Sequence, residues 1–508
     1  MKEQARRNIL RLHPSDNVIT ALVALGSGAV LPENVTCRQD IPAGHKVATV
    51  DIAPDAPVVK YGQIIGFASR PIARGEWVHT HNVYMKDFGR DYAFGADLKP
   101  TKMIPEAQRA TFMGFRRTDG RVATRNYIGV LATCNCSTSV VHYIADAFRG
   151  DALAAFPHVD GVVGLGHLTG CGGADDGTNL SLLRKAISGY ARHPNFAGVV
   201  LVGLGCETNQ VREQAEVIGL TQGDDFRVLN IQDMGSRATI EAGVAAVRAM
   251  LPRAELARRE PLPVSHLVLG VECGGSDAYS GITANPALGA AADILVAQGG
   301  TAVLSETPEV YGAEHLLTRR AVTREVGEKL VALIKWWERY TAAAGGEINN
   351  NPQPGNKAGG LTTILEKSLG AVAKGGTTNM VDVIDFADPI VKKGFIHMDT
   401  PGYDPVSVTG LVAGGANVIC FTTGRGSVFG CKPTPSIKLA TNTTMYRRLE
   451  QDMDLNCGVI AEGEAGVEEV GGKIFELVVA TASGAKTKSE KMGFGDYEFA
   501  PWTRGATI

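Results

Sequence analysis

The chain has 508 residues, of which 44 % are hydrophobic and 20 % are charged, which suits a folded protein of about three domains. Its formal net charge of −3 provides no basic surface for nucleic acid or an anionic membrane, so neither is expected as a partner. No window reaches the ~18 uninterrupted apolar residues of a membrane-spanning helix, and the N-terminal segment lacks the long apolar stretch of a secretion signal.

Short β-rich runs separated by turns fill the first part of the chain. They are NVITALVAL, HKVATVDI, VVKYGQIIGFA and WVHTHNV, with PAG, APDAP and ARG between them. This pattern predicts a small all-β module over residues 1–85. Residues 86–110 show no periodicity and are predicted to be a linker.

After residue 110, apolar strand-like runs alternate with helical patterns. The clearest helical patterns lie at 140–156, 237–251, 324–344 and 467–484. Such alternation predicts α/β units around a mostly parallel sheet. The polar segment at 253–265 marks a boundary, so we expect a central α/β domain over 111–255 and a C-terminal α/β domain over 256–508.

Five loops rich in glycine or small residues each follow an apolar run. They lie at 128–139, 161–173, 201–210, 271–286 and 419–430. Glycine makes up 61 of 508 residues, about 12 % against roughly 7 % in an average protein. Because glycine has no Cβ, such loops let a ligand approach the backbone, although many glycines simply serve βα turns. We expect the loops to form one composite site.

Four cysteines in these loops are candidate metal ligands. They are Cys136, Cys171, Cys206 and Cys273. No CxxC pair indicates a zinc ribbon, but thiolates from separate loops can bind one iron ion or one iron–sulfur cluster. The alternative is that they are small buried hydrophobic residues. Nine cysteines, an odd number without a secretion signal, favour reduced thiols and a cytoplasmic location.

Histidines appear in two places. His79 and His81 form an H-x-H pair that we expect on a strand, with both rings on one face, and His45 lies in the same module. These three are candidates for substrate or metal contact, although a surface strand would show the same alternation. His167 lies between glycines in the 161–173 loop and is predicted to face a site.

Charged residues beside predicted strand ends suggest acid–base chemistry on an anionic substrate. The segment SETPEVYGAEH offers three carboxylates, of which Glu306 directly follows a strand-like run and suits a general base or metal ligand. Lys357 lies with Asn356 in the turn-rich segment 345–360, where an ammonium group could meet a carboxylate or simply face solvent. Arg425 lies between two glycines, where its planar fork could bind a carboxylate bidentately.

Small polar residues complete the expected substrate site. Ser276, Asp277 and Asn285 lie in VECGGSDAYSGITANP at 271–286, and Thr423 lies in TTGRGS. Their side chains could hydrogen-bond a hydroxylated ligand held close to the backbone.

With these loops assembled, the sequence resembles the altronate/galactarate dehydratase family of sugar-acid hydro-lyases. The likeness includes IPAGHKVA, YGQIIG, GLGCE, ECGGSDAYSGITANP, SETPEVYGAEHLL, NPQPGNKAGG and TTGRGS, and it extends over nearly the whole chain. The resemblance implies a β-clip (SAF) domain, a middle domain that supports a homodimer, and a C-terminal Rossmann-like variant. It implies iron dependence, with manganese as an alternative. VHTHN and TPGYDPVSVTG look closer to the altronate type.

The resemblance implies dehydration of a sugar acid such as D-altronate to a 2-keto-3-deoxy acid, with galactarate or another hydroxy acid as the alternative. We expect iron to be held by the cysteine and histidine loops, and Arg425 and Lys357 to bind the substrate carboxylate. His167 or Glu306 would remove the C2 proton. The linker would let the N-terminal module fold over the α/β loops and add its histidines to the site.

Two other functional classes fit parts of the pattern. An NAD-dependent dehydrogenase would explain glycine-rich turns, but no GxGxxG stands in a βαβ unit with an acidic residue about 20 positions on. A non-catalytic sugar-acid-binding protein could use the β module as its reader. The five chemically rich loops favour an enzyme.

Overall fold

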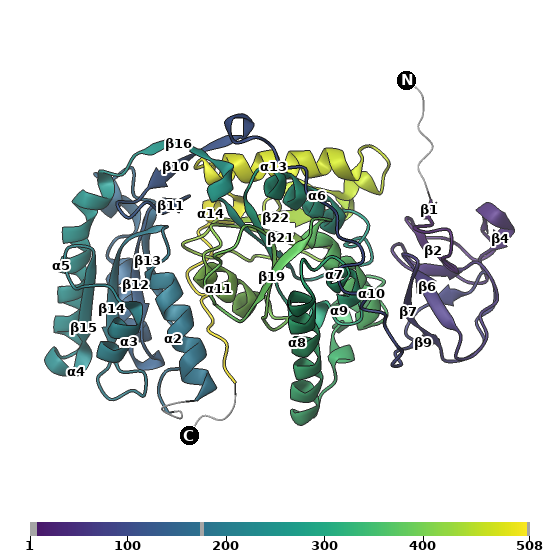
Figure 1. Ribbon diagram of the computed structural model, residues 1–508, viewed down its shortest axis with the longest axis horizontal. Coiled ribbons are helices and arrows are strands. Elements are labelled where there is room, and N and C mark those ends of the chain that lie inside the picture. The colour runs from purple at the N-terminus through teal and green to yellow at the C-terminus, as the bar shows by residue number, and fades with distance from the viewer. Residues whose placement is uncertain (1–7, 173–176, 505–508) are drawn as a thin grey trace.

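The computed structural model describes residues 8–172 and 177–504 and contains three domains in a row (Figure 1). The C-terminal domain lies between the N-terminal module and the central domain, so the order in space differs from the order in the chain. The first seven residues and Gly173, the last residue of the 161–173 loop, lie outside the described residues. No helix in the described ranges has the length and apolar character needed to cross a membrane.

The N-terminal module is built of short antiparallel strands, as the sequence predicts. Its strands are β1 (Ile9–Leu10), β2 (Val18–Ala21), β3 (Val30–Leu31), β4 (Val35–Thr36), β5 (Lys46–Ala48), β6 (Pro57–Lys60), β7 (Gln63–Ala68), β8 (Trp77–Val78) and β9 (Val83–Tyr84). They form sheets of order β1-β2-β5-β8 and β6-β7-β9 and the pair β3-β4. Alternate apolar side chains such as Ile19, Val47 and Val35 fill a small core.

The H-x-H pair does not lie on a strand, so that expectation is wrong. Strand β8 ends at Val78, and His79 and His81 occupy the turn before β9. The Asn82 side chain closes this turn, because it accepts from the His79 N–H at 2.8 Å and donates to the Trp77 carbonyl at 2.8 Å.

The predicted linker over 86–110 is irregular but not free. Its backbone N–H groups at Gly95, Asp97 and Ile104 donate to carbonyl groups of the C-terminal domain, at 3.1, 2.8 and 2.7 Å. The linker therefore follows the surface of the C-terminal domain on its way to the central domain, with one short 3-10 turn at Glu106–Gln108.

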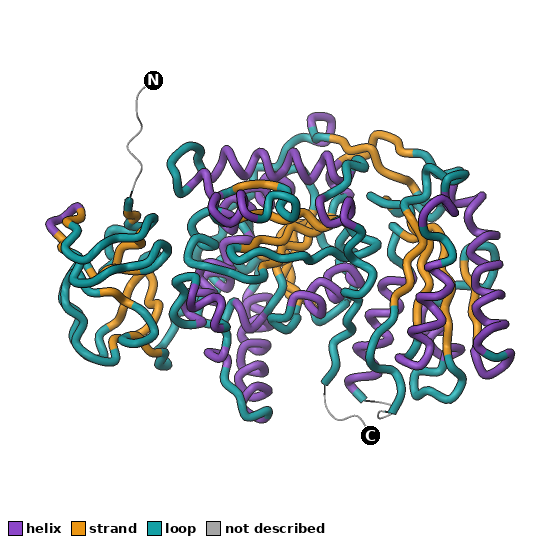
Figure 2. Tube along the Cα trace, turned by 180° about the vertical axis from the view of Figure 1, so that it is seen from behind, coloured by secondary structure: helices purple, strands orange, loops and turns teal. Residues whose placement is uncertain are grey.

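The central domain is a parallel sheet of order β13-β12-β14-β15 covered by helices (Figure 2). Its elements are β12 (Tyr127–Ala132), α1 (Thr138–Asp146), β13 (Gly161–Leu165), α2 (Thr178–Ala191), β14 (Phe196–Gly203), α3 (Val211–Ile218), β15 (Phe226–Asn230), α4 (Ile231–Met234) and α5 (Ser236–Glu255). Ile128 and Val130 point toward α1 and α5, whereas Leu131 packs with the core beneath α2. This alternation is what a strand buried on both faces requires.

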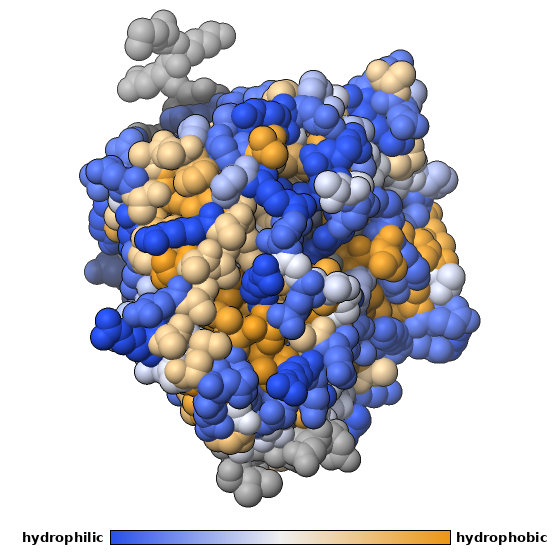
Figure 3. All heavy atoms as spheres, turned by 90° about the vertical axis from the view of Figure 1, so that its left-hand side faces the viewer, coloured by the Kyte–Doolittle hydropathy of each residue, from blue (hydrophilic) through white to orange (hydrophobic). Residues whose placement is uncertain are grey.

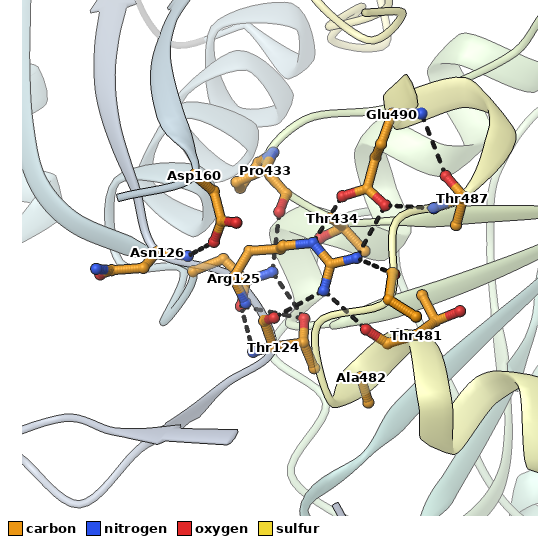
Figure 4. Close-up of polar contacts among 12 residues, drawn as sticks. Thr124, Arg125, Asn126, Asp160, Pro433, Thr434, Thr481, Ala482, Thr487 and Glu490 are labelled. Carbon is orange, nitrogen blue, oxygen red and sulfur yellow. Dashed lines mark hydrogen bonds and ion pairs between the residues drawn. The ribbon is translucent and has the colours of Figure 1, made fainter. Parts of the chain in front are cut away.

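A small antiparallel sheet connects the central and C-terminal domains. It pairs β10 (Thr111–Arg116) with β11 (Val122–Ala123) and β16 (Arg259–Pro263). Beside it, the buried Arg125 guanidinium lies 2.6 Å from Glu490 and donates to the carbonyl groups of Thr481 and Ala485 at 2.8 and 2.9 Å (Figure 4). These contacts fasten the two domains to each other.

The C-terminal domain contains a seven-stranded parallel sheet of order β19-β20-β18-β17-β21-β22-β23, which confirms the predicted fold class. The strands are β17 (Val268–Cys273), β18 (Thr301–Leu304), β19 (Met380–Ile384), β20 (Gly394–Met398), β21 (Val418–Thr423), β22 (Ser436–Ala440) and β23 (Leu455–Asn456). The helices are α6 (Ala284–Ala297), α7 (Glu314–Thr318), α8 (Arg324–Ala343), α9 (Pro354–Ala358), α10 (Ile364–Val372), α11 (Asp404–Gly414), α12 (Thr443–Arg448), α13 (Val467–Ala482) and α14 (Lys488–Met492).

Two strongly periodic segments form helices where the sequence predicts them, α8 at 324–343 and α13 at 467–482. The segment 345–360 is more ordered than its composition suggests. It contains a 3-10 turn at Ile348–Asn350 and helix α9, each closed by a capping box. Lys357 therefore lies on a short helix rather than in a flexible loop.

Candidate functional site

A cavity lies at the carboxyl edge of the seven-stranded sheet of the C-terminal domain. Strand β17 ends at Cys273, Glu306 follows β18, and Arg425 follows β21. Because β18, β17 and β21 are neighbours and parallel, their ends meet at one edge. The cavity there has a volume of about 440 Å³, and its walls include Cys273, Glu309, Lys367, Asp404 and Arg425.

The floor of this cavity is a buried thiol between two carboxylates. Cys273 Sγ lies 3.7 Å from Oε2 of Glu306 and 3.6 Å from Oε2 of Glu309. One ligand atom from each of these three residues lies within 4.8 Å of the others, and Glu272, Glu306 and Asp404 form a second such group. Neither of these groups, the two found among the described residues, includes a histidine.

Two buried lysines neutralise these carboxylates. Lys374 Nζ lies 3.0 Å from Glu306, and Lys367 Nζ lies 2.6 Å from Glu309. Lys367 also donates to Oδ1 of Asn351 at 2.8 Å, while the Asn351 amide donates to Glu309 at 2.8 Å. Paired charges of this kind remain ionised at depths where isolated charges could not.

The pKa values of these carboxyl groups are shifted in different directions. Burial and the Glu309 charge raise the pKa of Glu306, against the opposing charge of Lys374. Burial alone would raise the pKa of Glu309, but Lys367 and Lys374 outweigh it and keep that pKa below its usual range. Burial and the charges of Glu306 and Glu309 raise the pKa of Asp404 to about 7. Neighbouring carboxyl groups with separated pKa values are typical of acid–base sites.

Glu306 has an unusual backbone conformation. Its φ and ψ of 66° and 62° lie in the left-handed region, which is strained for a residue with a side chain. The Thr400 hydroxyl holds it there by accepting from the Glu306 N–H at 2.8 Å. The strain directs the carboxylate toward Cys273 instead of along the strand.

The floor residues fit a divalent metal ion. Oε1 of Glu306 and Oε1 of Glu272 are buried and have no hydrogen-bond partner among the described residues. A buried oxygen without a partner is costly unless a cation or water meets it. One thiol and several carboxylate oxygens form a mixed donor set that iron and manganese accept.

Five residues predicted from the sequence meet at this cavity or directly behind it. Cys273, Asn356 and Arg425 line it, and Glu306 contacts Cys273 from behind. The Asn356 amide donates to the Ser276 carbonyl at 2.8 Å, and the Ser276 hydroxyl is buried without a partner among the described residues. This part of the predicted site is therefore brought together by the fold.

Three other predicted substrate contacts are engaged within the protein. Asp277 accepts from the Thr441 hydroxyl at 2.9 Å and the Asn442 amide at 3.0 Å. Asn285 donates to the Gly370 carbonyl at 2.9 Å and accepts from the Thr422 hydroxyl at 2.7 Å. The Thr423 hydroxyl accepts from the Gly426 N–H at 3.0 Å. These side chains shape the loops around the cavity.

Lys357 is half-buried on α9 and is not among the residues that line the cavity, whereas its neighbour Asn356 is. The helix turns the two side chains in different directions, because successive residues on an α-helix do not share a face.

The three histidines of the N-terminal module cluster around Trp77 instead of lining the cavity. The Trp77 ring stacks on His79, and its Nε1 donates to His45 Nδ1 at 3.1 Å. His81 is exposed and lies against the same indole. Burial and the Lys46 charge lower the pKa of His45, opposed by a hydrogen bond with the Ala358 backbone on α9. The module thus contacts the segment that bears Asn356.

His167 and three of the predicted metal ligands lie in another domain. Cys136, Cys171 and Cys206 are exposed at the carboxyl edge of the central sheet, while Cys273 is buried in the C-terminal domain. The cysteines expected to share one metal therefore lie at the edges of two sheets, because loops from parallel strands meet only at the edge of their own sheet. His167 lines a second cavity of about 430 Å³ together with Tyr403, and Tyr403 also lines the Cys273 cavity. His167 bonds through Nε2 to the Ala132 carbonyl at 3.1 Å, and burial lowers its pKa to about 4.

The sequence did not single out Glu309, Lys367, Lys374 or Asp404. Lys367 and Lys374 are seven residues apart, which is two helical turns, so their spacing would have placed them on one face. The surrounding helix α10 is buried along its whole length and therefore shows no polar face. Asp404 is the first residue of α11, and Asp399, not Asp404, directly follows β20. A search for carboxylates directly after each strand would therefore have found Asp399 instead.

Comparison with known proteins agrees with this architecture. Residues 7–86 match the altronate/galactarate dehydratase SAF domain, 114–255 the second domain of D-galactarate dehydratase/altronate hydrolase, and 264–507 the C-terminal domain of D-galactarate/altronate dehydratase. The chain is 38 % identical to galactarate dehydratase (L-threo-forming) of Escherichia coli, covering 95 % of this chain and 94 % of that protein. It is 35 % identical to altronate dehydratase of Bacillus subtilis, covering 99 % of this chain and 100 % of that protein. It is also 35 % identical to altronate dehydratase of Escherichia coli, covering 98 % of this chain and 99 % of that protein. The chain belongs to the altronate/galactarate dehydratase family.

Proposed function

We propose that the protein is a hydro-lyase that dehydrates a sugar acid, with D-altronate as the first candidate, to a 2-keto-3-deoxy acid. The observation that carries this proposal is the cavity floor, where Cys273, Glu306 and Glu309 meet two buried lysines. Two full-length relatives named altronate dehydratase support altronate. Galactarate is the alternative, because the relative named for it is 38 % identical.

Dehydration removes the C2 proton and the C3 hydroxyl of the acid, and the resulting enol tautomerises to the keto product. Asp404 lines the cavity with its pKa raised to about 7 by burial and by Glu306 and Glu309, so it suits a base for the C2 proton. Lys367 lines the same cavity and would donate a proton to the departing hydroxyl. In this assignment Glu306, which lies behind Cys273, does not accept the C2 proton. It contributes negative charge at the cavity floor.

Substrate binding would fall to the rim of the cavity. Arg425 is exposed there and has a guanidinium fork that matches a carboxylate. Asn351 and Asn356 also line the cavity; each amide already donates one bond within the protein and has a second N–H that could meet a hydroxyl group of a sugar acid.

We further propose that Cys273, Glu306 and Glu309 hold a divalent metal, Fe²⁺ with Mn²⁺ as an alternative. The metal would supply Lewis-acid stabilisation of the negative charge that develops on the substrate carboxylate. Chelators and air should inactivate the enzyme, and ferrous iron with a reductant should restore it, because thiol ligands oxidise and bound iron is removed. Full activity in a metal-free sample would contradict this proposal.

A substrate panel tests the activity. Anaerobically purified protein with ferrous iron is incubated with altronate, galactarate and other aldonates, and keto-acid release is measured. We expect the highest kcat/KM with altronate. A higher kcat/KM with galactarate would assign the alternative, and binding without turnover of any sugar acid would support a non-catalytic binding protein.

We also propose a homodimer formed through the central domain. Strand β15 is an edge strand that pairs only with β14 among the described residues. Figure 3 shows hydrophobic patches among polar side chains on this side of the molecule, and Val217, Leu220 and Met234 are 43, 36 and 46 % exposed. Light scattering should give twice the chain mass, and Leu220→Glu with Met234→Glu should give a monomer. A monomeric native protein would exclude this assembly.

The proposed location is the cytoplasm. All nine cysteines are free, including three exposed ones, which suits a reducing compartment. Cell fractionation tests this, and recovery of the protein outside the cytoplasmic fraction would contradict it.

A further inference from the structure

The three exposed cysteines of the central domain form a cluster that the proposed dehydration does not use. Of nine cysteines, only Cys136, Cys171 and Cys206 are exposed. Each follows a different strand, β12, β13 or β14, and these three strands are adjacent in the sheet. Because parallel strands end at the same edge, the fold gathers three thiols from distant parts of the chain.

The loops that carry the cysteines are bonded to one another. The Asn135 N–H donates to the Thr169 carbonyl at 2.9 Å, which joins the first loop to the second. The Asn209 N–H donates to the Gly170 carbonyl at 3.1 Å, and its amide donates to the Thr133 carbonyl at 3.2 Å, which joins the third loop to both others. The cysteines are therefore presented by a braced scaffold, as a metal site requires.

Two side-chain and backbone features place the loops this close. Glu207 accepts from the Thr133 hydroxyl at 2.9 Å and the Leu204 N–H at 3.0 Å, and so orients the turn that holds Cys206. Gly170 has a φ of +93°, and a Cβ there would approach the Thr133 carbonyl oxygen to 2.3 Å. A larger residue at that position would push the Cys171 loop away from the Cys136 loop.

A side chain also holds the third thiol in place, because the Gln232 amide of α4 donates to Cys206 Sγ at 3.1 Å. A cationic centre stabilises thiolates that the fold brings near one another.

The spacing suits a cluster better than a single ion. Three thiolates on one tetrahedral ion, with metal–sulfur bonds of about 2.3 Å, would lie about 3.8 Å apart. Among the described residues, three ligand atoms approach within 4.8 Å of one another only in the C-terminal domain. At least one pair among the sulfur atoms of Cys136, Cys171 and Cys206 is therefore more than 4.8 Å apart, which is too far for a single tetrahedral ion but not for a multi-iron centre.

We propose that Cys136, Cys171 and Cys206 bind an iron–sulfur cluster in the central domain. Three thiolates leave one iron of a four-iron cluster for a ligand other than cysteine. This site is separate from Cys273 and its carboxylates, and it does not depend on the sugar-acid chemistry proposed for them.

The test uses the full-length chain, reconstituted under anaerobic conditions with ferrous iron and sulfide. We expect acid-labile sulfide together with slightly more iron, because Cys273, Glu306 and Glu309 are proposed to hold one further iron per chain, and the visible absorption of thiolate-to-iron charge transfer. Cys136→Ser, Cys171→Ser and Cys206→Ser should each reduce that absorption by about tenfold or more. Cys37→Ala, at a buried cysteine of the N-terminal module, and Cys273→Ser should retain it.

A second measurement does not depend on variants. Alkylation followed by mass spectrometry should modify the three exposed cysteines of the apo-protein and spare them after reconstitution. Uptake of iron without sulfide, a spectrum unchanged in the Cys136, Cys171, Cys206 triple variant, or unprotected thiols after reconstitution would each overturn the proposal. Loss of the spectrum in Cys273→Ser would also overturn it, because the centre would then belong to the C-terminal site.

Discussion

Lys46 Nζ in the N-terminal module lies 2.8 Å from Oε2 of Glu366 in helix α10 of the C-terminal domain, and both side chains are fully buried. Lys60 reaches the other oxygen of the same carboxylate at 2.9 Å. Glu366 directly precedes Lys367, which lines the cavity. The module is therefore anchored to the helix that supplies a cavity residue.

Replacing Lys46 by methionine should weaken this anchor. In the native protein the buried Glu366 carboxylate pairs with two lysines, and the variant would leave it with one. Breaking a buried ion pair costs ~3–5 kcal/mol. We expect a lower free energy of unfolding in denaturant titrations and faster protease cleavage within 86–110. Lys99→Met, at an exposed linker lysine, is the control and should behave as the native protein does. Equal cleavage rates for the two variants would contradict the anchoring role.

The same contact predicts a loss of stability in acid. Burial raises the pKa of Glu366, but the charges of Lys46 and Lys60 outweigh it, so its pKa in the folded protein lies below the ordinary value. Its contribution is therefore complete above the unfolded carboxyl pKa of about 4.3 and declines as the pH falls below that value. Denaturant titrations from pH 7 to acid should show this decline. Glu366→Gln should be less stable at pH 7 and lack this part of the pH dependence; an unchanged profile would exclude Glu366 as its source.

Arg425→Lys should retain the fold but lose most turnover. An ammonium group cannot reproduce two parallel hydrogen bonds to a carboxylate, and charge-assisted bonds of ~1.5–3 kcal/mol correspond to a roughly 10- to 100-fold lower kcat/KM. Steady-state kinetics with the preferred sugar acid measures this. Arg248→Lys, on exposed helix α5 of the central domain, is the matched control. A near-native kcat/KM in Arg425→Lys would remove Arg425 from the site.

Lys367→Met should abolish most activity through kcat. The change removes the proposed proton donor, and general acid catalysis contributes about 10²–10⁴-fold. It also leaves Glu309 without its nearest cation at 2.6 Å, so the pKa of Glu309 should rise. The pH–rate profile should shift accordingly, whereas Lys335→Met, at an exposed lysine of α8, should change neither kcat nor the profile. If Lys367→Met lowered KM and left kcat unchanged, Lys367 would not be the proton donor.

Cutting the linker separates the role of the module from its covalent attachment. With a protease site introduced within 86–110, the cleaved module should stay bound at neutral pH and turnover should persist, because the buried Lys46–Glu366–Lys60 contact holds it.

Residues 111–508 alone should turn over slowly, and added residues 1–85 should restore the rate. A module carrying His81→Ala should still restore it, since His81 is exposed. If the fragment alone were as fast as the full chain, the module would have no part in the active site.

The sequence predicted those features that depend on local pattern. The helices at 324–343 and 467–482 could be predicted because their apolar periodicity extends over several turns. The turn at His79 and His81 could not, since the Asn82 side chain overrides a β-like pattern. That the four candidate cysteines lie in two domains could not be predicted either, because a local sequence pattern does not show to which sheet a strand belongs. Cys273 and Cys206 both follow apolar runs and glycines, yet the two strands lie in different domains.

The left-handed conformation of Glu306 has a consequence for how substrate preference can change. The Glu306 main chain is held by Thr400, and its buried carboxylate is held by Lys374 at 3.0 Å, so it cannot follow a repositioned ligand without breaking that ion pair. The cavity floor is rigid in that sense, whereas Tyr403 at the rim is 62 % exposed and Arg425 is exposed beside it. Substitutions at the rim can thus adapt the enzyme to acids of different length or end group while the chemistry beneath remains unchanged.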